Sequence, residues 1–302
     1  MGPRHPARRR RSAGPCHPRG PAPGPGAGRL SRGPAHGRGA HARGLDAARA
    51  RAARGHHARA CRHSRDAQLR QRDLAAAHVS SRAPAGRVAE VFYSIQGEGA
   101  TAGMPAVFVR LQGCSVGCAW CDTKYSWDPE AGRAVDLDAL VDEAAAFPCR
   151  RAVVTGGEPL ESSLFVPLLR SLGERGFAIE VETSGILPPP RVGRAVQWNV
   201  SVKLAGSGVA ESRRIQPASI RGFLAQDAWW KFVVTDDADV AEVLKLAERF
   251  ALPRARILLQ PEAVRREDLL ERSPGVVEAC KRHGFGFSPR LHVLLWGARR
   301  GV

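Results

Sequence analysis

The chain has 302 residues and a formal net charge of +17, and this charge is concentrated in its first part. Residues 1–87 contain 20 arginines, no lysine and three acidic side chains, whereas residues 88–302 contain 26 basic and 26 acidic side chains. The neutral second part excludes a uniformly basic nucleic-acid-binding domain. The longest apolar runs are too short to predict a membrane-spanning helix.

The cysteine content excludes a further class of protein. Seven cysteines, an odd number in a long chain, do not suit a secreted scaffold held together by disulfides. The Arg-rich N-terminus also lacks the apolar stretch of a secretory signal. We therefore expect the protein in the reducing cytoplasm.

Residues 1–87 are rich in Arg, Pro, Gly and Ala, and every Phe, Trp and Tyr of the chain follows residue 90. Such a segment cannot bury enough apolar surface to offset its conformational entropy, so we predict a disordered basic extension. We favour its interpretation as sequence upstream of a true start near Val79 or Val88. A targeting segment and a nucleic-acid-binding tail are alternatives, but the tail lacks the aromatic side chains that stack on bases.

Strand-like and helix-like segments alternate along residues 88–302. Apolar runs predict strands at residues 88–93, 106–111, 151–154, 179–181, 198–202, 232–234 and 257–259. Helical spacing predicts a helix that begins at Asp136 and helices over residues 164–172, 238–250 and 269–283. The alternation implies parallel strands with right-handed crossovers and ligands at their carboxyl ends. Because the units are too few for an eight-fold barrel, we expect an α/β domain with a partial, open parallel barrel.

Three cysteines lie within eight residues, in Cys114-Ser-Val-Gly-Cys118-Ala-Trp-Cys121. Thiolate groups of this kind bind soft metals or iron–sulfur clusters, and Gly113 and Gly117 allow the backbone to wrap tightly. A structural zinc site needs four ligands, whereas three thiolates on a four-iron cluster leave one iron open for chemistry. The sequence favours the cluster. A zinc site completed by a distant residue and a redox-active dithiol are alternatives.

This cysteine loop resembles the cluster-binding motif of the radical S-adenosylmethionine superfamily. A second segment, Gly156-Gly157-Glu158-Pro159, resembles the Gly-Gly-Glu-Pro motif of the same superfamily and follows in the right order. Three further segments, Phe92-Tyr-Ser-Ile-Gln-Gly-Glu-Gly99, Cys121-Asp-Thr123 and Trp296-Gly297, are similar to the 7-carboxy-7-deazaguanine synthase family. The resemblance covers residues 88–302 and leaves out the basic extension.

The resemblance implies a fold of the radical S-adenosylmethionine type and a reaction. That family converts 6-carboxy-5,6,7,8-tetrahydropterin to 7-carboxy-7-deazaguanine and ammonia by a radical ring contraction, in the biosynthesis of queuosine and other 7-deazapurines. Its cofactors are a 4Fe–4S cluster, S-adenosylmethionine and Mg²⁺. The resemblance also implies a homodimer and an external one-electron donor, such as a flavodoxin or a ferredoxin.

The resemblance further assigns residues to each ligand. Cys114, Cys118 and Cys121 would ligate the cluster, and the Thr123 hydroxyl would bind Mg²⁺, which prefers oxygen ligands. The S-adenosylmethionine site would consist of Trp120, Cys121, Asp122, Gly157, Ser201, Val202, Lys203, Gln260, Pro261 and Glu262. The substrate site would consist of Ile95, Gln96, Gly97, Arg110, Thr155 and the terminal carboxylate of Val302. Val202 stands where the family has proline, and Glu262 also departs from the family pattern.

Structural explanations stay open for several of these residues and their neighbours. The alternatives are a turn for Gln96 and Glu98, a surface ion pair for Arg110, a helix cap for Thr123, a structural carboxylate for Glu158, solvated lysines for Lys203 and Lys231, and a structural imidazole for His292.

Two other functions stay open as well. A radical S-adenosylmethionine activase, which generates a glycyl radical on a partner protein, has the same cysteine triplet but needs no pterin site. The turn at residues 94–99 and Thr123 argue against it. A zinc-binding RNA module would use the basic extension, but the neutral domain and the three clustered cysteines argue against that function.

Overall fold

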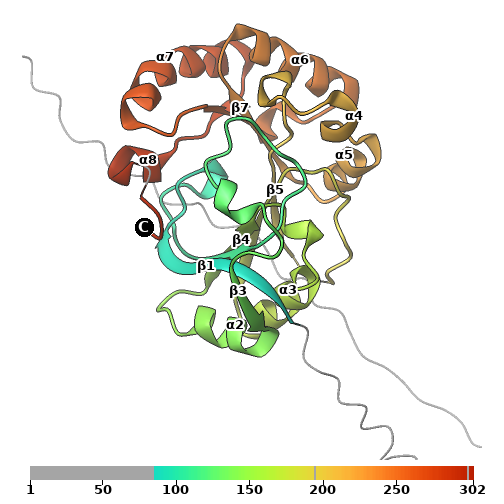
Figure 1. Cartoon of the computed structure of the whole chain (residues 1–302). Coiled ribbons are helices and arrows are strands. Elements are labelled where there is room, and N and C mark those ends of the chain that lie inside the picture. The colour runs from blue at the N-terminus through green and yellow to red at the C-terminus, as the bar shows by residue number, and fades with distance from the viewer. Residues whose placement is uncertain (1–84, 194, 298) are drawn as a thin grey trace, which may run out of the picture. The chain divides into compact units, whose positions relative to one another are not determined.

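The computed structural model describes residues 85–193, 195–297 and 299–302 (Figure 1). Our prediction of a disordered extension concerns residues that lie outside these ranges, apart from Ala85, Gly86 and Arg87. Those three residues belong to the first strand, so the sheet includes residues before the predicted boundary at Val88. Among the described residues, no helix combines the length and the apolar character needed to cross a bilayer.

Within the described ranges, nine strands form one sheet in the order β3-β1-β2-β4-β5-β6-β7-β8-β9. The strands are β1 (Ala85–Ile95), β2 (Pro105–Leu111), β3 (Arg133–Asp136), β4 (Arg151–Gly156), β5 (Ala178–Thr183), β6 (Gln197–Val200), β7 (Trp229–Val234), β8 (Ile257–Pro261) and β9 (Gly286–Phe287). The helices are α2 (Leu137–Ala145), α3 (Phe165–Glu174), α4 (Glu211–Arg214), α5 (Pro217–Leu224), α6 (Asp237–Phe250), α7 (Arg266–His283) and α8 (Leu291–Trp296).

The strands from β2 through β9 are parallel, and β3 and β9 are the two edges of the sheet, so the barrel is open as expected. The first strand differs from the predicted pattern, because β1 is antiparallel to both β2 and β3. The reason is the short connection between β1 and β2, which has no room for a crossover helix and forms a hairpin instead.

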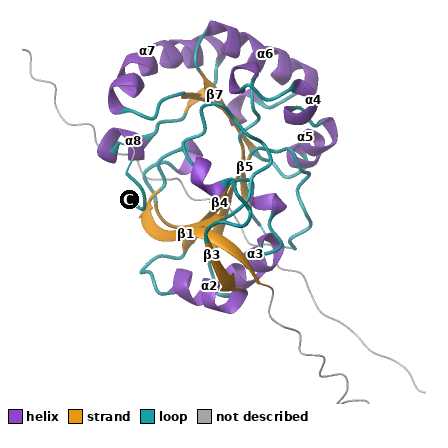
Figure 2. Ribbon diagram, viewed as in Figure 1, coloured by secondary structure: helices purple, strands orange, loops and turns teal. Residues whose placement is uncertain are grey.

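Helices cover the outer face of the curved sheet (Figure 2). Along each parallel strand, alternate side chains point to opposite faces. In β5, Ile179 and Val181 belong to the main apolar core, whereas Glu182 lines a cavity on the inner face. In β2, Val107, Val109 and Leu111 likewise belong to the core. The polar side chains of the sheet are therefore gathered inside the barrel.

The predicted helices α2, α3, α6 and α7 are present, whereas α5 is an element that the sequence analysis did not find. Pro217 occupies its first turn, which suits a residue without an N–H donor. Phe223 of α5 is buried and its ring lies 5.3 Å from that of Trp198. The short helix is therefore fixed by packing against the sheet rather than by a long apolar repeat of its own.

Candidate active site

A cavity of about 560 Å³ lies at the carboxyl ends of the parallel strands, and it brings together most of the predicted site residues. Two of them, Val202 and Pro261, do not line it. The Val202 side chain is only 3% exposed and belongs to the apolar core, and Pro261 is the last residue of β8, paired with Val234. The remaining predicted residues of the cluster, cofactor and substrate sites all face the cavity.

The cysteine loop follows β2 and is held by backbone hydrogen bonds. The N–H of Gly113 donates to the carbonyl oxygen of Ser126 at 2.9 Å, and the N–H of Cys114 donates to the carbonyl oxygen of Trp127 at 3.0 Å. Gly113 and Gly117 have φ values of 103° and 75°, which side chains other than that of glycine rarely permit. The loop therefore turns back on itself at both glycines, as the sequence predicted.

All three cysteines of this loop line the cavity. Cys118 is buried, Cys114 and Cys121 are half-buried, and the indole N–H of Trp127 donates to Cys121 Sγ at 3.3 Å. Among the described residues, no three His, Cys, Asp or Glu side chains converge as the ligands of a single metal ion do. A four-iron cluster fits this arrangement, because each of its thiolates binds a different iron.

Burial raises the pKa of the Cys114 thiol to about 11, and it also raises the pKa of Cys118. Without a metal, both groups are therefore neutral thiols at neutral pH. Iron binds the thiolate, so that formation of a cluster has to release these protons.

The Gly-Gly-Glu-Pro segment at the end of β4 approaches the cysteine loop very closely. A Cβ atom added at Gly157 would lie 2.2 Å from the carbonyl oxygen of Gly113 and 2.5 Å from Cys114 Cβ. The N–H of Glu158 donates to the same Gly113 oxygen at 2.9 Å. Only glycine fits at residue 157, and the contact fixes the first cysteine against β4.

Glu158 has the structural role that the sequence analysis kept open. Its carboxylate accepts hydrogen bonds from the Thr183 hydroxyl at 2.7 Å, from the Ser184 N–H at 2.8 Å and from the Leu160 N–H at 3.2 Å. The side chain is fully buried, and burial raises its pKa although these hydrogen bonds oppose the shift. Glu158 therefore joins the end of β4 to the end of β5.

Thr123 follows the third cysteine and precedes a short 3-10 helix (Lys124–Ser126). Its hydroxyl makes no capping hydrogen bond to that helix, so the helix-cap alternative is wrong. Thr123 Oγ1 lies 3.5 Å from Cys121 Sγ, and the residue lines the cavity. The hydroxyl is thus beside the cysteine loop, and its role as a Mg²⁺ ligand stays a prediction.

Residues at or just after the ends of β6 and β8 add polar groups to the cavity lining. Lys203 Nζ donates to Ser201 Oγ at 3.0 Å and lies 5.3 Å from the centroid of the Trp120 ring. Gln260 Oε1 accepts from the Ser288 hydroxyl at 2.9 Å. Glu262 is paired with Arg272 of α7, so its carboxylate is already occupied. The backbone of residue 262 is used as well, because its N–H donates to the Val234 carbonyl oxygen at 3.0 Å and its carbonyl oxygen accepts from Arg272.

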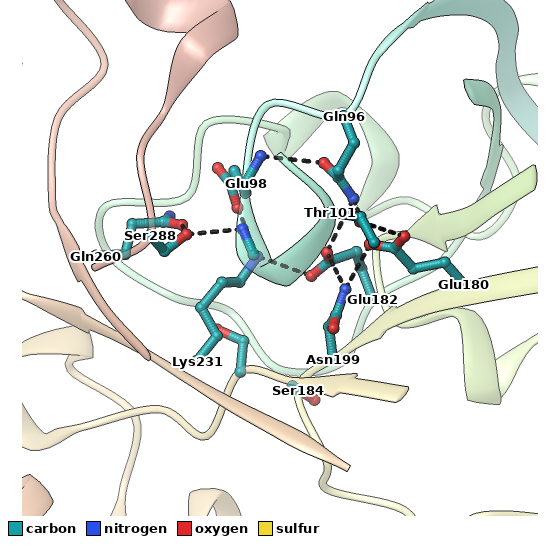
Figure 3. A network of polar contacts seen from close by, with 12 residues as sticks. Gln96, Glu98, Thr101, Glu180, Glu182, Ser184, Asn199, Lys231, Gln260 and Ser288 are labelled. Carbon is teal, nitrogen blue, oxygen red and sulfur yellow. Dashed lines mark hydrogen bonds and ion pairs between the residues drawn. The ribbon is translucent and has the colours of Figure 1, made fainter. Parts of the chain in front are cut away.

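A buried polar network forms the floor of the cavity (Figure 3). Gln96 donates through Nε2 to Glu180 at 2.7 Å and to Glu182 at 3.3 Å, and its Oε1 accepts from the Glu98 N–H at 3.2 Å. Asn199 Nδ2 donates to the same two carboxylates at 2.6 and 2.9 Å. The Gln96 carboxamide is therefore used within the protein, and so is much of the turn's backbone, because the Gln96 N–H donates to the Met104 carbonyl oxygen and the Gly97 carbonyl oxygen accepts from the Leu291 N–H.

Lys231 is the central cation of this floor. It is only 4% exposed and forms ion pairs with Glu98 at 2.5 Å and with Glu182 at 2.7 Å, so the solvated-lysine alternative is wrong for this residue. Burial alone would lower the pKa of Lys231, but the two carboxylates raise it above its ordinary value. Burial would raise the pKa of Glu98, but Lys231 and Arg290 lower it well below its ordinary value. Lys231 and Glu98 are therefore charged at neutral pH, whereas burial raises the pKa of the Glu182 carboxyl although Lys231 opposes the shift.

Arg110 on β2 is paired with Glu90 of β1 at 2.7 Å, and the Tyr125 hydroxyl donates to the same carboxylate oxygen at 2.7 Å. The Arg110 side chain is only 15% exposed, so this is a cavity pair rather than the surface pair considered from sequence. Thr155 and Val302 line the same cavity. The lining of the cavity therefore includes the Arg110 guanidinium and the last residue of the chain.

His292 lies against the turn after β1. A Cβ atom at Gly97 would come within 2.2 Å of His292 Nδ1, so the turn and the imidazole are packed tightly. Burial lowers the pKa of His292 although Glu98 opposes the shift. The imidazole is therefore neutral at neutral pH, and it also lines the cavity.

Comparisons with known proteins agree with this geometry. Residues 108–198 match the model of the Radical SAM superfamily. The 7-carboxy-7-deazaguanine synthase of Pyrobaculum aerophilum is 42% identical over 231 residues, which cover 73% of this chain and 99% of that protein. The enzyme of the same name from Hyperthermus butylicus is 36% identical over 69% of this chain and 92% of its own length. The chain belongs to the 7-carboxy-7-deazaguanine synthase family.

A solved structure leads to the same family. The crystal structure of QueE from Escherichia coli superposes with a TM-score of 0.55 and 27% sequence identity, over 68% of this chain and 93% of that one. The predicted fold, the radical S-adenosylmethionine class and the family resemblance are thereby confirmed. As a member of a radical S-adenosylmethionine family, the chain uses a 4Fe–4S cluster and S-adenosylmethionine. The roles of the individual residues stay predictions.

The sequence analysis did not assign Glu182, Asn199 or Arg290 to the site, and it kept Lys231 only as a possible surface residue. A signal was present in the strands. Asn199 and Lys231 are each flanked by two core residues in sequence, so that a polar side chain alternates with apolar ones and points into the barrel. For Arg290, which precedes α8, the sequence offers no comparable pattern.

Proposed function

We propose that this chain converts 6-carboxy-5,6,7,8-tetrahydropterin to 7-carboxy-7-deazaguanine and ammonia. The observation that carries the proposal is that the three-cysteine loop and the buried Glu98–Lys231–Glu182 network line one cavity. Membership of the 7-carboxy-7-deazaguanine synthase family supports the same reaction. The product is a precursor of queuosine and other 7-deazapurines.

The cavity is complementary to such a substrate in charge. The pyrimidine edge of a pterin carries N–H donors, and the Glu98 and Glu182 carboxylates accept hydrogen bonds. The carboxylate of the substrate suits the Arg110 guanidinium, whose planar array of donors matches two oxygens. We place the substrate between these two regions, with Thr155 and the terminal carboxylate of Val302 as further contacts.

The cysteine loop fits the cluster in its donor set, its glycine-dependent turns and its close contact with Gly157. When bound, the cluster and S-adenosylmethionine supply an adenosyl carbon radical that can remove a hydrogen atom from the substrate. In this proposal Cys114, Cys118 and Cys121 hold the cluster, and Trp120 and Lys203 flank the nucleotide. The surrounding strand ends exclude water, which keeps side reactions of a radical to a minimum.

Thr123 is proposed as a protein ligand of Mg²⁺. Its hydroxyl is an oxygen donor of the type that Mg²⁺ prefers, and it is not used as a helix cap. Replacement of Thr123 by Ala is expected to leave the iron content unchanged and to weaken the Mg²⁺ dependence of turnover. An unchanged Mg²⁺ dependence would remove Thr123 from the metal site.

Location, assembly and redox partner are proposed from the family resemblance alone. We propose a cytoplasmic homodimer that receives single electrons from a flavodoxin or a ferredoxin, with residues 88–302 as the catalytic domain. Size-exclusion chromatography with light scattering tests the dimer. The activase alternative gains no support from the comparisons, whose relatives carry the name of the deazaguanine synthase.

The decisive experiment is an anaerobic assay of the reconstituted full chain with a reductant, S-adenosylmethionine, Mg²⁺ and 6-carboxy-5,6,7,8-tetrahydropterin. We expect 7-carboxy-7-deazaguanine and ammonia in equal amounts. A cluster-loaded enzyme that cleaves S-adenosylmethionine but forms no deazaguanine would contradict the proposed reaction and keep the superfamily chemistry.

A further inference from the structure

Arg290 lies between β9 and α8, and its guanidinium contacts three segments that are far apart in sequence. Its Nε donates to Glu98 Oε1 at 3.0 Å, its Nη2 is paired with Asp122, and its Nη1 donates to the carbonyl oxygen of Ala263. The side chain is only 8% exposed. One buried side chain therefore connects the turn after β1, the cysteine loop and the segment after β8.

Each of these segments carries a different part of the proposed site. Glu98 belongs to the turn that carries the predicted substrate residues Gln96 and Gly97, and Asp122 follows the third cysteine in the segment assigned to S-adenosylmethionine. Ala263 comes directly after the predicted adenosyl-contacting residues. The three nitrogens of a guanidinium lie in one rigid plane, so a displacement of one partner shifts the others.

The two carboxylates depend on Arg290 to different degrees. Glu98 retains Lys231 if Arg290 is removed, whereas Asp122 has Arg290 as its ion-pair partner among the described residues and is 40% exposed. Loss of the guanidinium is therefore expected to affect Asp122 and the cysteine loop more than Glu98. A buried arginine paired with two carboxylates is in addition costly to remove, because the partners are left uncompensated.

We propose that Arg290 is a positioning residue that fixes the substrate turn against the S-adenosylmethionine segment, so that each ligand binds more tightly when the other is bound. This inference rests on the proposed function for the identity of the substrate. Hydrogen-atom transfer requires the two ligands to be in close and defined contact, so their relative placement matters as much as their individual binding. Coupling of this kind is reciprocal by thermodynamic necessity.

The test measures binding rather than turnover. The affinity of the oxidised, cluster-loaded full chain for S-adenosylmethionine is determined by anaerobic equilibrium dialysis, with and without the carboxytetrahydropterin. We expect the pterin to tighten S-adenosylmethionine binding about tenfold in the unmodified chain, a typical coupling between sites. In Arg290→Gln and in Arg290→Lys this ratio should fall to about one.

Arg175→Gln is the matched control, because Arg175 forms an exposed ion pair with Asp142 between α3 and α2. It should keep the ratio of the unmodified chain. A ratio unchanged in Arg290→Gln, with only thermal stability or iron content reduced, overturns the proposal. Arg290→Lys keeps the charge, so it also decides the question where Arg290→Gln fails to retain its cluster.

A second measurement needs neither cluster nor pterin. Amide hydrogen exchange of the metal-free chain should become faster in both residues 96–99 and residues 120–123 when Arg290 is replaced by Gln. The increase should be larger in residues 120–123, because Glu98 in the other segment keeps its ion pair with Lys231. Unchanged exchange in residues 120–123 overturns the proposal. If the unmodified chain binds S-adenosylmethionine but not the pterin, the proposed function is wrong. The role of Arg290 is then tested by hydrogen exchange alone.

Discussion

The cysteine loop and the polar floor of the same cavity are built in opposite ways. The loop is one short stretch of chain whose side chains are left free for a ligand, and its shape depends on glycines and backbone hydrogen bonds. The floor combines Gln96, Glu98, Glu182, Asn199 and Lys231 from separate elements, and its side chains are largely paired with one another. The loop therefore offers unpaired side chains to a group that binds later. The polar side chains of the floor already satisfy one another without a ligand.

The sharpest test of this comparison is the removal of one loop thiol. Cys118→Ala is expected to abolish the cluster and all turnover, because two thiolates cannot hold a four-iron cluster stably. Iron and sulfide analysis and the visible absorbance of the reconstituted protein measure the effect. Cys149→Ala, at a half-buried cysteine outside the cavity, should load iron normally. Equal iron in both variants would refute the assignment of the loop.

The corresponding test of the floor is the removal of its central cation. Lys231→Met leaves the Glu98 and Glu182 carboxylates facing each other in a buried site, and we expect a loss of about 3–5 kcal/mol in the free energy of unfolding. Denaturant unfolding of the metal-free chain measures it. Lys281→Met, which removes an exposed pair with Glu278, should cost at most about 1 kcal/mol. Similar losses in the two variants would show that the floor is not preformed.

The close contact between Gly157, which follows β4, and the cysteine loop, which follows β2, is expected to give a smaller change in stability. Gly157→Ala forces a methyl group against Gly113 and Cys114, and we expect a loss of about 1–3 kcal/mol in stability together with a lower iron content. Gly275→Ala is the control, because no atom lies within 4 Å of its added Cβ in α7. That variant should be neutral or slightly stabilised, as alanine favours a helix. A Gly157→Ala protein with normal iron content would show that the loop tolerates a wider separation from β4.

The last test is a pH dependence that only the loop should show. Because burial raises the pKa of Cys114 to about 11 and also raises that of Cys118, the free thiols are protonated at neutral pH. Iron binding releases these protons, so the apparent affinity for the cluster should increase with pH, by up to about tenfold per pH unit for each proton released. Reconstitution titrated between neutral and mildly alkaline pH measures the slope. A flat profile would show that the thiols are already ionised.

The loop could be predicted from the sequence because its determinants are contiguous. Cys114, Cys118, Cys121 and their glycines specify the turn and the ligands without reference to the rest of the chain. The strand–helix alternation likewise predicted the open parallel barrel. The antiparallel direction of β1 was harder to predict, since the residues of an apolar strand do not by themselves indicate which strand it pairs with or in which direction.

The floor was harder to predict, because it depends on the register of neighbouring strands. Asn199 of β6 lies opposite Glu182 of β5, and this register brings Asn199 Nδ2 to the carboxylates of both Glu180 and Glu182. Arg290 was missed for a similar reason, since its partners are separated from it by between 27 and 192 residues. Such contacts are consequences of the folded chain rather than of a local pattern.

The pairing of β1 with β3 sets a limit on how far the chain can be shortened. Ala85, Gly86 and Arg87 face Asp136, Val135 and Ala134 across the edge of the sheet. A protein truncated to begin at Val88 would lose these partners and would expose the backbone of β3, an edge that invites intermolecular association. A version that begins at Val79 retains the whole ladder and is the better choice for purification and crystallisation.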